Sequence, residues 1–77
     1  MPNETIALDA KGLACPLPVL KARKLLKSMG PGKILEIEAT DQAATRDFTA
    51  FCEAAGHQLL ERRTSDGVLY FKICKGS

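Results

Sequence analysis

Hydrophobic and polar positions follow two different periods in the first half of the chain. The segment ETIALDA alternates Ile6 and Leu8 with less apolar neighbours, which predicts a strand over residues 4–10. From residue 17 to residue 29, apolar positions recur every three or four residues, which predicts an amphipathic helix. The GPG segment at 30–32 is expected to end this helix.

The same two periods return in the second half. KILEIEA at 33–39 alternates aliphatic residues with glutamates, which predicts a second strand. TDQAA then leads into a second helix, which is expected to end at Gly56. HQLLERRT and VLYFKIC flank SDG at 65–67 and are predicted to form two antiparallel strands joined by a short turn. The apolar stripe of the second helix contains Phe48, Phe51, Cys52 and Ala55.

The predicted order of elements is βαβαββ. Because crossovers between parallel strands are right-handed, both helices are expected on the same face of one sheet. The predicted fold class is therefore α+β, a two-layer α/β sandwich in which a four-stranded mixed sheet carries two helices on one face and leaves the other face open. The 77 residues, 1–77, are expected to form a single domain, because a chain of this length has one core and no linker, repeat or low-complexity segment interrupts it.

Composition narrows the classes of function. Apolar residues at 45% and charged residues at 26% are ordinary for a soluble globular protein. No apolar run is long enough for a membrane span, and the first residues lack a basic region followed by a hydrophobic one. We therefore expect a cytoplasmic protein that does not enter a membrane and is a monomer when free.

The cysteines indicate thiol chemistry and not a disulfide framework. Cys15, Cys52 and Cys74 form no CxxC pair, and their odd number leaves at least one thiol unpaired. His57 is the single histidine, and it follows a residue expected to end a helix, so a surface or capping role is predicted for it. Since none of these side chains has the close paired spacing of a structural zinc site, no metal site is expected.

The net charge of +2 is unevenly distributed along the chain. Residues 10–35 contain six basic residues and no acid. Such a patch could bind an acidic protein surface or a phosphate backbone, and it is also the pattern of a solvated helix face. The basic residues are Lys11, Lys21, Arg23, Lys24, Lys27 and Lys33.

Cys15 stands directly before Pro16, Leu17 and Pro18 at the start of the first helix. Proline is tolerated in a first helical turn, so Pro16 is assigned to position N1, Pro18 to N3 and Cys15 to the N-cap. The helix dipole should then favour the thiolate. Because the prolines remove two donors, the Leu17 N–H is left as the main backbone partner of the sulfur, and only a modest fall in the thiol pKa is expected. A purely capping role is disfavoured, since Ser, Thr, Asp and Asn cap helices better.

The loops after the first two strands should meet at one edge of the sheet. Parallel strands share their carboxyl edge, where open α/β sheets place their sites, so Thr40 and Asp41 are expected near Cys15. Asp41 could alternatively cap the second helix. Cys52 and Cys74 fall in apolar stretches and are expected to pack as small hydrophobic residues.

Four segments together resemble the TusA/SirA-like sulfur-carrier proteins: LDAKGLACPLPVLKARKLL, ATDQAATRDF, FCEAAGHQLLE and DGVLYFKICKG. The resemblance runs from Leu8 to Gly76 and centres on the Cys-Pro-X-Pro signature, which is Cys15-Pro16-Leu17-Pro18 in this chain. It implies a strand order of 1-2-4-3, with the fourth strand antiparallel to the rest. It also implies that Cys15 accepts sulfane sulfur from a cysteine desulfurase or a rhodanese-like donor and relays it, as a persulfide, to an acceptor protein without a bound cofactor.

The resemblance further implies a sulfurtransferase that acts as a carrier and not as an independent catalyst. Members of this family serve tRNA thiolation, molybdenum-cofactor metabolism or sulfur oxidation. Many tRNA-thiolation members carry an acidic residue where this chain has Leu17, and an apolar residue there suits a different partner surface. The residues expected to face a partner or shape the site are Pro16, Leu17, Pro18, Lys21, Lys24, Asp41 and Arg46.

Two other classes of function compete with the carrier. An RNA-binding module is suggested by the basic first helix and by a resemblance of the fold to the C-terminal domain of the third bacterial initiation factor. That helix has no aromatic residue for base stacking, so direct nucleic-acid binding is not expected. A thiol redox enzyme would need a resolving partner for Cys15, and the sequence offers no obvious one.

Overall fold

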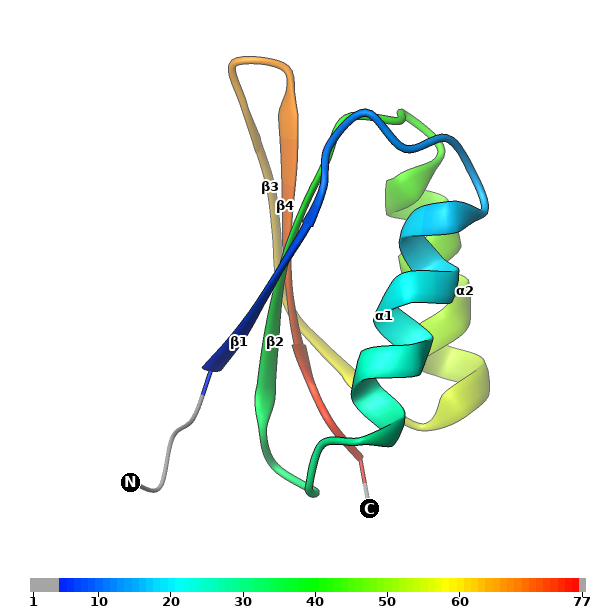
Figure 1. The fold of residues 1–77 in the computed structure, drawn as a ribbon, viewed down its shortest axis with the longest axis vertical. Helices are drawn as coiled ribbons and strands as arrows, with labels where there is room; N and C mark the ends of the chain where they lie inside the picture. The colour runs from blue at the N-terminus through cyan, green and yellow to red at the C-terminus, as the bar shows by residue number, and fades with distance from the viewer. Residues whose placement is uncertain (1–4, 77) are drawn as a thin grey trace.

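The computed structural model describes residues 5–76, and its elements follow the predicted order (Figure 1). The single sheet has the order β1-β2-β4-β3, in which β1 and β2 are parallel and β4 is antiparallel to both of its neighbours. The predicted fold class and strand order are therefore confirmed. Residue 4, the predicted start of the first strand, lies outside the described residues. The elements are β1 (Thr5–Ala10), α1 (Leu17–Lys27), β2 (Ile34–Ala39), α2 (Ala44–Ala55), β3 (Gln58–Ser65) and β4 (Val68–Cys74).

Both helices cover the same face of the sheet, as the right-handed crossovers require (Figure 1). Along β4 buried and partly buried residues alternate, so one side of each strand faces the helices and the other faces solvent. Phe48 of α2 packs on Phe71 of β4 with 4.9 Å between ring centroids. The largest fully buried side chains are Phe48, Leu26, Leu35, Ile37 and Ile73.

The ends of the helices are set by specific partners. α1 ends at Lys27 and not at Met29 as predicted. The ammonium group of Lys75 donates hydrogen bonds to the carbonyls of Leu26 at 2.6 Å and Met29 at 3.0 Å, so the tail after β4 satisfies carbonyls at this end. Met29 still packs in the core, which is why its position matched the helical period. α2 ends at Gly56 with a left-handed φ of 79°, as predicted.

The hairpin of β3 and β4 closes through Asp66 and Gly67. Both residues have positive φ, 52° and 79°, which is the backbone of a two-residue turn that matches the twist of the strands. The predicted SDG turn is thus confirmed. Within the described residues, no helix has the length and apolarity needed to cross a membrane.

Candidate functional site

The loop that carries Cys15 packs against the loop that follows β2. Both loops lie at the carboxyl ends of the parallel strands, at the end of the sheet where α1 and α2 begin (Figure 1). The Gly12 N–H donates to the Thr40 hydroxyl at 3.0 Å, and the Cys15 N–H donates to the Asp41 carboxylate at 2.7 Å. The prediction that Thr40 and Asp41 lie near Cys15 is therefore confirmed.

The first turn of α1 starts later than predicted. Pro16 is the N-cap, so Leu17 occupies N1 and Pro18 occupies N2, while Cys15 precedes the cap. The Leu17 N–H donates to the Ala14 carbonyl at 2.9 Å and closes a turn across Cys15 and Pro16. This turn removes the donor that was expected to bind the sulfur. The predicted N-cap role of Cys15 is thus wrong, as is the predicted hydrogen bond from Leu17 to its sulfur.

The partner of the Cys15 sulfur comes from α2 instead. The thiol donates a hydrogen bond to Oδ2 of Asp47, with 2.7 Å between sulfur and oxygen. This bond raises the pKa of Cys15, and partial desolvation and the charges of Asp47 and Asp41 add to the rise, while Arg46 opposes it. The predicted fall in the thiol pKa is therefore wrong, because the hydrogen bond to the Asp47 carboxylate stabilises the protonated thiol.

Asp47 is the site residue that the sequence interpretation missed. It lies in the first turn of α2, and that turn begins at the same edge of the sheet as the Cys15 loop. The position of the carboxyl ends of the parallel strands predicted Asp41, which lies in the loop after β2, but not a residue of the helix that follows. The first turn of the predicted second helix begins at the same edge, and an acid is common in a first turn because it interacts favourably with the helix dipole. These two signals together point to Asp47.

Asp41 joins the two loops of the site. One carboxylate oxygen accepts the Cys15 N–H, and the other accepts the Ala43 N–H at 2.8 Å. The hydrogen bonds from these two backbone groups lower the pKa of Asp41. The N-cap of α2 is Ala43, so Asp41 is not the cap residue, although it binds the backbone just before the helix.

Exposure separates Cys15 from the other two thiols. Cys15 is exposed, Cys52 is buried and Cys74 is partly buried, as their sequence context predicted. The His57 Nδ1 accepts the Gly76 N–H at 2.9 Å, so this side chain binds the tail after β4, while its backbone N–H donates to the Cys52 carbonyl at the end of α2. Among the described residues, no three His, Cys, Asp or Glu side chains are grouped so that they could hold a metal ion.

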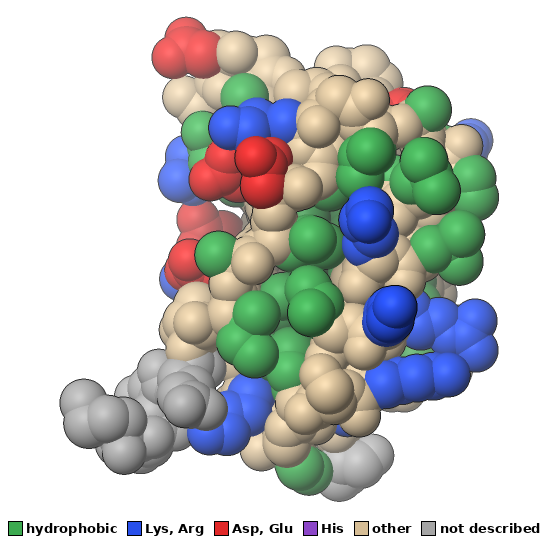
Figure 2. All heavy atoms as spheres, viewed as in Figure 1, with side chains coloured by type: hydrophobic (Ala, Val, Ile, Leu, Met, Phe, Trp, Pro, Cys, Tyr) green, Lys and Arg blue, Asp and Glu red, His purple; other side chains and the backbone are tan. Residues whose placement is uncertain are grey.

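The exposed surface of α1 next to Cys15 combines apolar and basic side chains. Leu17 is 44% exposed and Leu20 is 50% exposed, and Lys21 and Lys24 are exposed on the same helix. We call these four residues the α1 face. Figure 2 shows hydrophobic side chains at the upper end of the helical layer and basic ones along its middle and lower parts.

The other residues expected in the site lie in different surroundings. Pro16 is exposed beside Cys15, whereas Pro18 is buried and can act on the site only through the shape of the first turn. Arg46 has a side chain that is 83% exposed, and its Nε lies 3.9 Å from Asp47. Arg46 thus lies beside the carboxylate that binds the thiol, and its charge opposes the rise in the pKa of Cys15.

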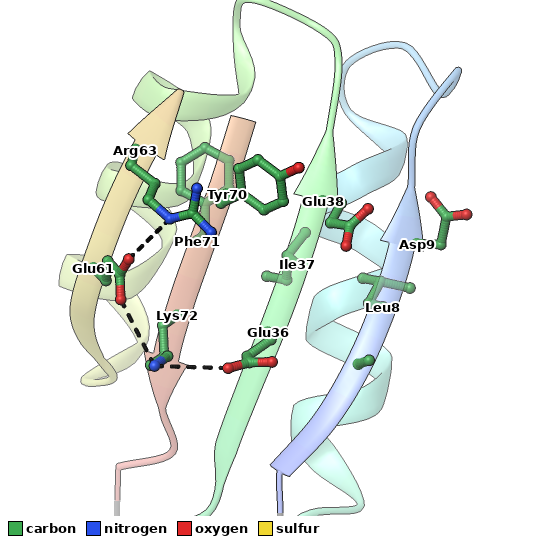
Figure 3. A pocket seen from close by; sticks show the side chains of 11 residues that line it. Leu8, Asp9, Glu36, Ile37, Glu38, Glu61, Arg63, Tyr70, Phe71 and Lys72 are labelled. Atoms are coloured by element: carbon green, nitrogen blue, oxygen red, sulfur yellow. Dashed lines mark hydrogen bonds and ion pairs between the residues drawn. The ribbon is translucent and has the colours of Figure 1, made fainter. Parts of the chain in front are cut away.

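A hollow of about 410 Å³ lies on the open face of the sheet (Figure 3). Lys72 in this hollow pairs with Glu36 at 3.6 Å and Glu61 at 3.7 Å, and Arg63 lies over the ring of Tyr70 at 4.1 Å. Its two basic residues pair with acidic neighbours in the hollow, and its lining residues do not include Cys15. The candidate site is therefore the Cys15 loop at the edge of the sheet.

Comparison with known proteins gives a consistent result. The family model "Sulfurtransferase TusA" matches residues 6–75. YrkI of Bacillus subtilis is 46% identical over 69 residues, which cover 90% of this chain and 92% of that protein. The sulfur carrier protein TusA of Allochromatium vinosum is 44% identical over 68 residues, with 88% and 90% covered. A crystal structure of a SirA-like protein from Desulfitobacterium hafniense matches with a TM-score of 0.82 and 28% identity, covering 94% of this chain and 99% of that one.

Proposed function

This chain belongs to the TusA family of sulfurtransferases, and we propose that it carries sulfane sulfur as a persulfide on Cys15 and relays it between two proteins. The observation that carries this proposal is the exposure of Cys15 at the sheet edge, whereas Cys52 is buried and Cys74 is partly buried. Two partners must reach the same sulfur in turn, and only an exposed thiol allows this.

The proposed uptake is an exchange between a thiolate and a persulfide. The Cys15 sulfur attacks the outer sulfur of the donor's persulfide, a new S–S bond forms, and the donor's S–S bond breaks. The donor cysteine leaves as a thiolate, so the proton lost by Cys15 is balanced by the proton that the donor takes up. No external oxidant or reductant is consumed. A cysteine desulfurase or a rhodanese-like protein is the expected class of donor.

The proposed delivery repeats the exchange in the opposite sense. A thiolate of the acceptor protein attacks the outer sulfur of the Cys15 persulfide, and Cys15 leaves as a thiolate. Each step needs only thiol groups, which fits a carrier that relies on its partners for activation. We therefore propose a protein acceptor downstream, without assigning the pathway that it serves.

The α1 face supports protein partners over RNA. The exposed apolar side chains beside Cys15 are Leu17 and Leu20, which suit an apolar protein surface but offer no aromatic ring for base stacking. Tyr70 lies on the open face of the sheet and not beside the basic helix. The lysines of the α1 face are therefore proposed to meet acidic side chains of a protein.

The first prediction is that Cys15 alone accepts sulfur from a cysteine desulfurase supplied with cysteine. Intact mass should increase by one sulfur atom in the wild type and in Cys74→Ser, and it should not increase in Cys15→Ser. The serine hydroxyl can still donate to Asp47, so Cys15→Ser should fold with an unchanged melting temperature. Sulfur bound to Cys15→Ser, or a collapsed melting temperature in that variant, would contradict the proposal.

A further inference from the structure

Asp47 faces the reactive sulfur from a different helix. Its Oδ2 lies 2.7 Å from the Cys15 sulfur, across 32 residues of sequence, and its side chain is 23% exposed. The contact joins the first turn of α2 to the loop before α1. A carboxylate this close accepts a hydrogen bond from the protonated thiol, which stabilises that form, and it repels a thiolate at the same position.

The other charged groups at the sulfur do not cancel this effect. Asp41, from the loop after β2, adds a second negative charge while its oxygens bind the Cys15 and Ala43 amides. Arg46 is the opposing cation, and its side chain is mostly in solvent, where its effect is screened. The first turn of α1 contributes no acid. The net effect of the charges around the Cys15 sulfur is therefore that of a negative charge.

We propose that Asp47 is a positioning residue that retains the transferred sulfur on Cys15 until a partner neutralises its carboxylate. This inference rests on the proposed carrier function. In exchange between thiols and persulfides, the thiol with the lower pKa leaves faster, and the thiolate with the higher pKa is the better nucleophile. A carboxylate beside Cys15 makes this cysteine a poor leaving group and thereby keeps sulfur on the carrier.

A cationic group of the acceptor would reverse the effect. When a partner's Arg or Lys pairs with Asp47, the negative field at the sulfur weakens and Cys15 becomes a better leaving group. The acceptor thiolate then forms its bond to the outer sulfur while the bond between the two sulfur atoms breaks. Cys15 departs as a thiolate and takes a proton from water, which restores the hydrogen bond to Asp47.

The first test measures the thiol without any partner. The alkylation rate of Cys15 by iodoacetamide is recorded against pH for the wild type and Asp47→Asn. Asp47→Asn should titrate at lower pH, and for each unit of that fall its rate at pH 7 should rise about threefold, because more thiolate outweighs its lower nucleophilicity. Glu53→Gln removes the same charge from α2 away from the sulfur and should match the wild type. Equal titration curves for wild type and Asp47→Asn would overturn the assignment.

The second test measures retention on the loaded carrier. A neutral phosphine removes the outer sulfur as a phosphine sulfide and releases Cys15 as the thiol, without a charge that Asp47 could repel. Loss of sulfur should be faster from Asp47→Asn than from the wild type, and Asp47→Glu should remain near the wild type. Equal rates of loss would overturn the retention role. If the wild type acquires no sulfur on Cys15, the carrier function fails, while the alkylation result still decides whether Asp47 controls the thiol.

Discussion

Cys52 illustrates at the residue scale how burial changes the chemistry of a thiol. Its side chain lies in the core on α2, and this burial raises its pKa to about 11. The apolar stripe of the second predicted helix was enough to anticipate this, because burial follows from helical periodicity. The pKa of Cys15 could not be anticipated in the same way, since it depends on one carboxylate from a distant part of the chain.

The raised pKa of Cys52 predicts a loss of stability at alkaline pH. In the unfolded chain this thiol ionises near pH 9, whereas in the folded protein it stays protonated up to about 11. The contribution of the protonated Cys52 thiol to the free energy of unfolding is therefore complete below pH 9. It is lost as pH rises from 9 to 11, by roughly 1.4 kcal/mol per pH unit.

Urea unfolding of the wild type and Cys52→Ala from pH 8 to 11 measures this contribution. The free energy of unfolding should fall more steeply with pH in the wild type, because only the wild type carries the Cys52 thiol and all other side chains are common to both proteins. The alanine variant loses some packing at every pH, which shifts its curve without changing the slope. Parallel curves would show that Cys52 ionises equally well in the folded and unfolded states.

At the scale of elements, the sequence predicted which helices and strands form but not how α1 begins. Periodicity defined all six elements, and Gly56 and the Asp66–Gly67 turn were read correctly from residue type. The two prolines allowed more than one register for the first turn. The hydrogen bond from Leu17 to Ala14 selects the register with Pro18 at N2, and local preferences alone do not determine such a bond.

Asp41 is predicted to hold the two site loops together. Asp41→Ala removes the acceptor for the Cys15 and Ala43 amides and leaves both N–H groups to solvent. We expect a melting temperature several degrees lower, and faster amide hydrogen exchange at Cys15 and Ala43 than in the wild type. The relative rates of amide hydrogen exchange among the core strands should be the same as in the wild type. Glu53→Ala, an exposed acid on α2, serves as the control and should change neither measurement.

The two faces of the whole molecule differ in how their charges are arranged. On the open face of the sheet, basic and acidic side chains pair with one another (Figure 3). On the helical side, α1 carries exposed lysines and no acid in its first turn. The uneven charge along the sequence anticipated this asymmetry. The exposure of Leu17 and Leu20 could not be predicted from the sequence, because it depends on how α1 packs on the sheet.

This asymmetry predicts that the α1 face guides protein donors to Cys15. Replacing Lys21 and Lys24 by glutamine removes two positive charges from that face. Initial sulfur uptake from a cysteine desulfurase should fall by up to about tenfold at low salt, because steering by complementary charge raises association rates. The difference should shrink as ionic strength rises, since the screening length is about 10 Å at 0.1 M salt.

The matched control removes the same net charge from a different element. Arg62→Gln with Arg63→Gln changes two exposed residues of β3, and it should leave sulfur uptake near the wild-type rate. Alkylation of Cys15 by neutral iodoacetamide should be equal in all three proteins, because the lysines act on the encounter and not on the thiol. If the β3 variant slows uptake as much as the α1 variant, net charge is responsible and not the α1 face. If the α1 variant is slower at every salt concentration, its lysines make direct contacts that screening does not remove, and steering is the wrong explanation.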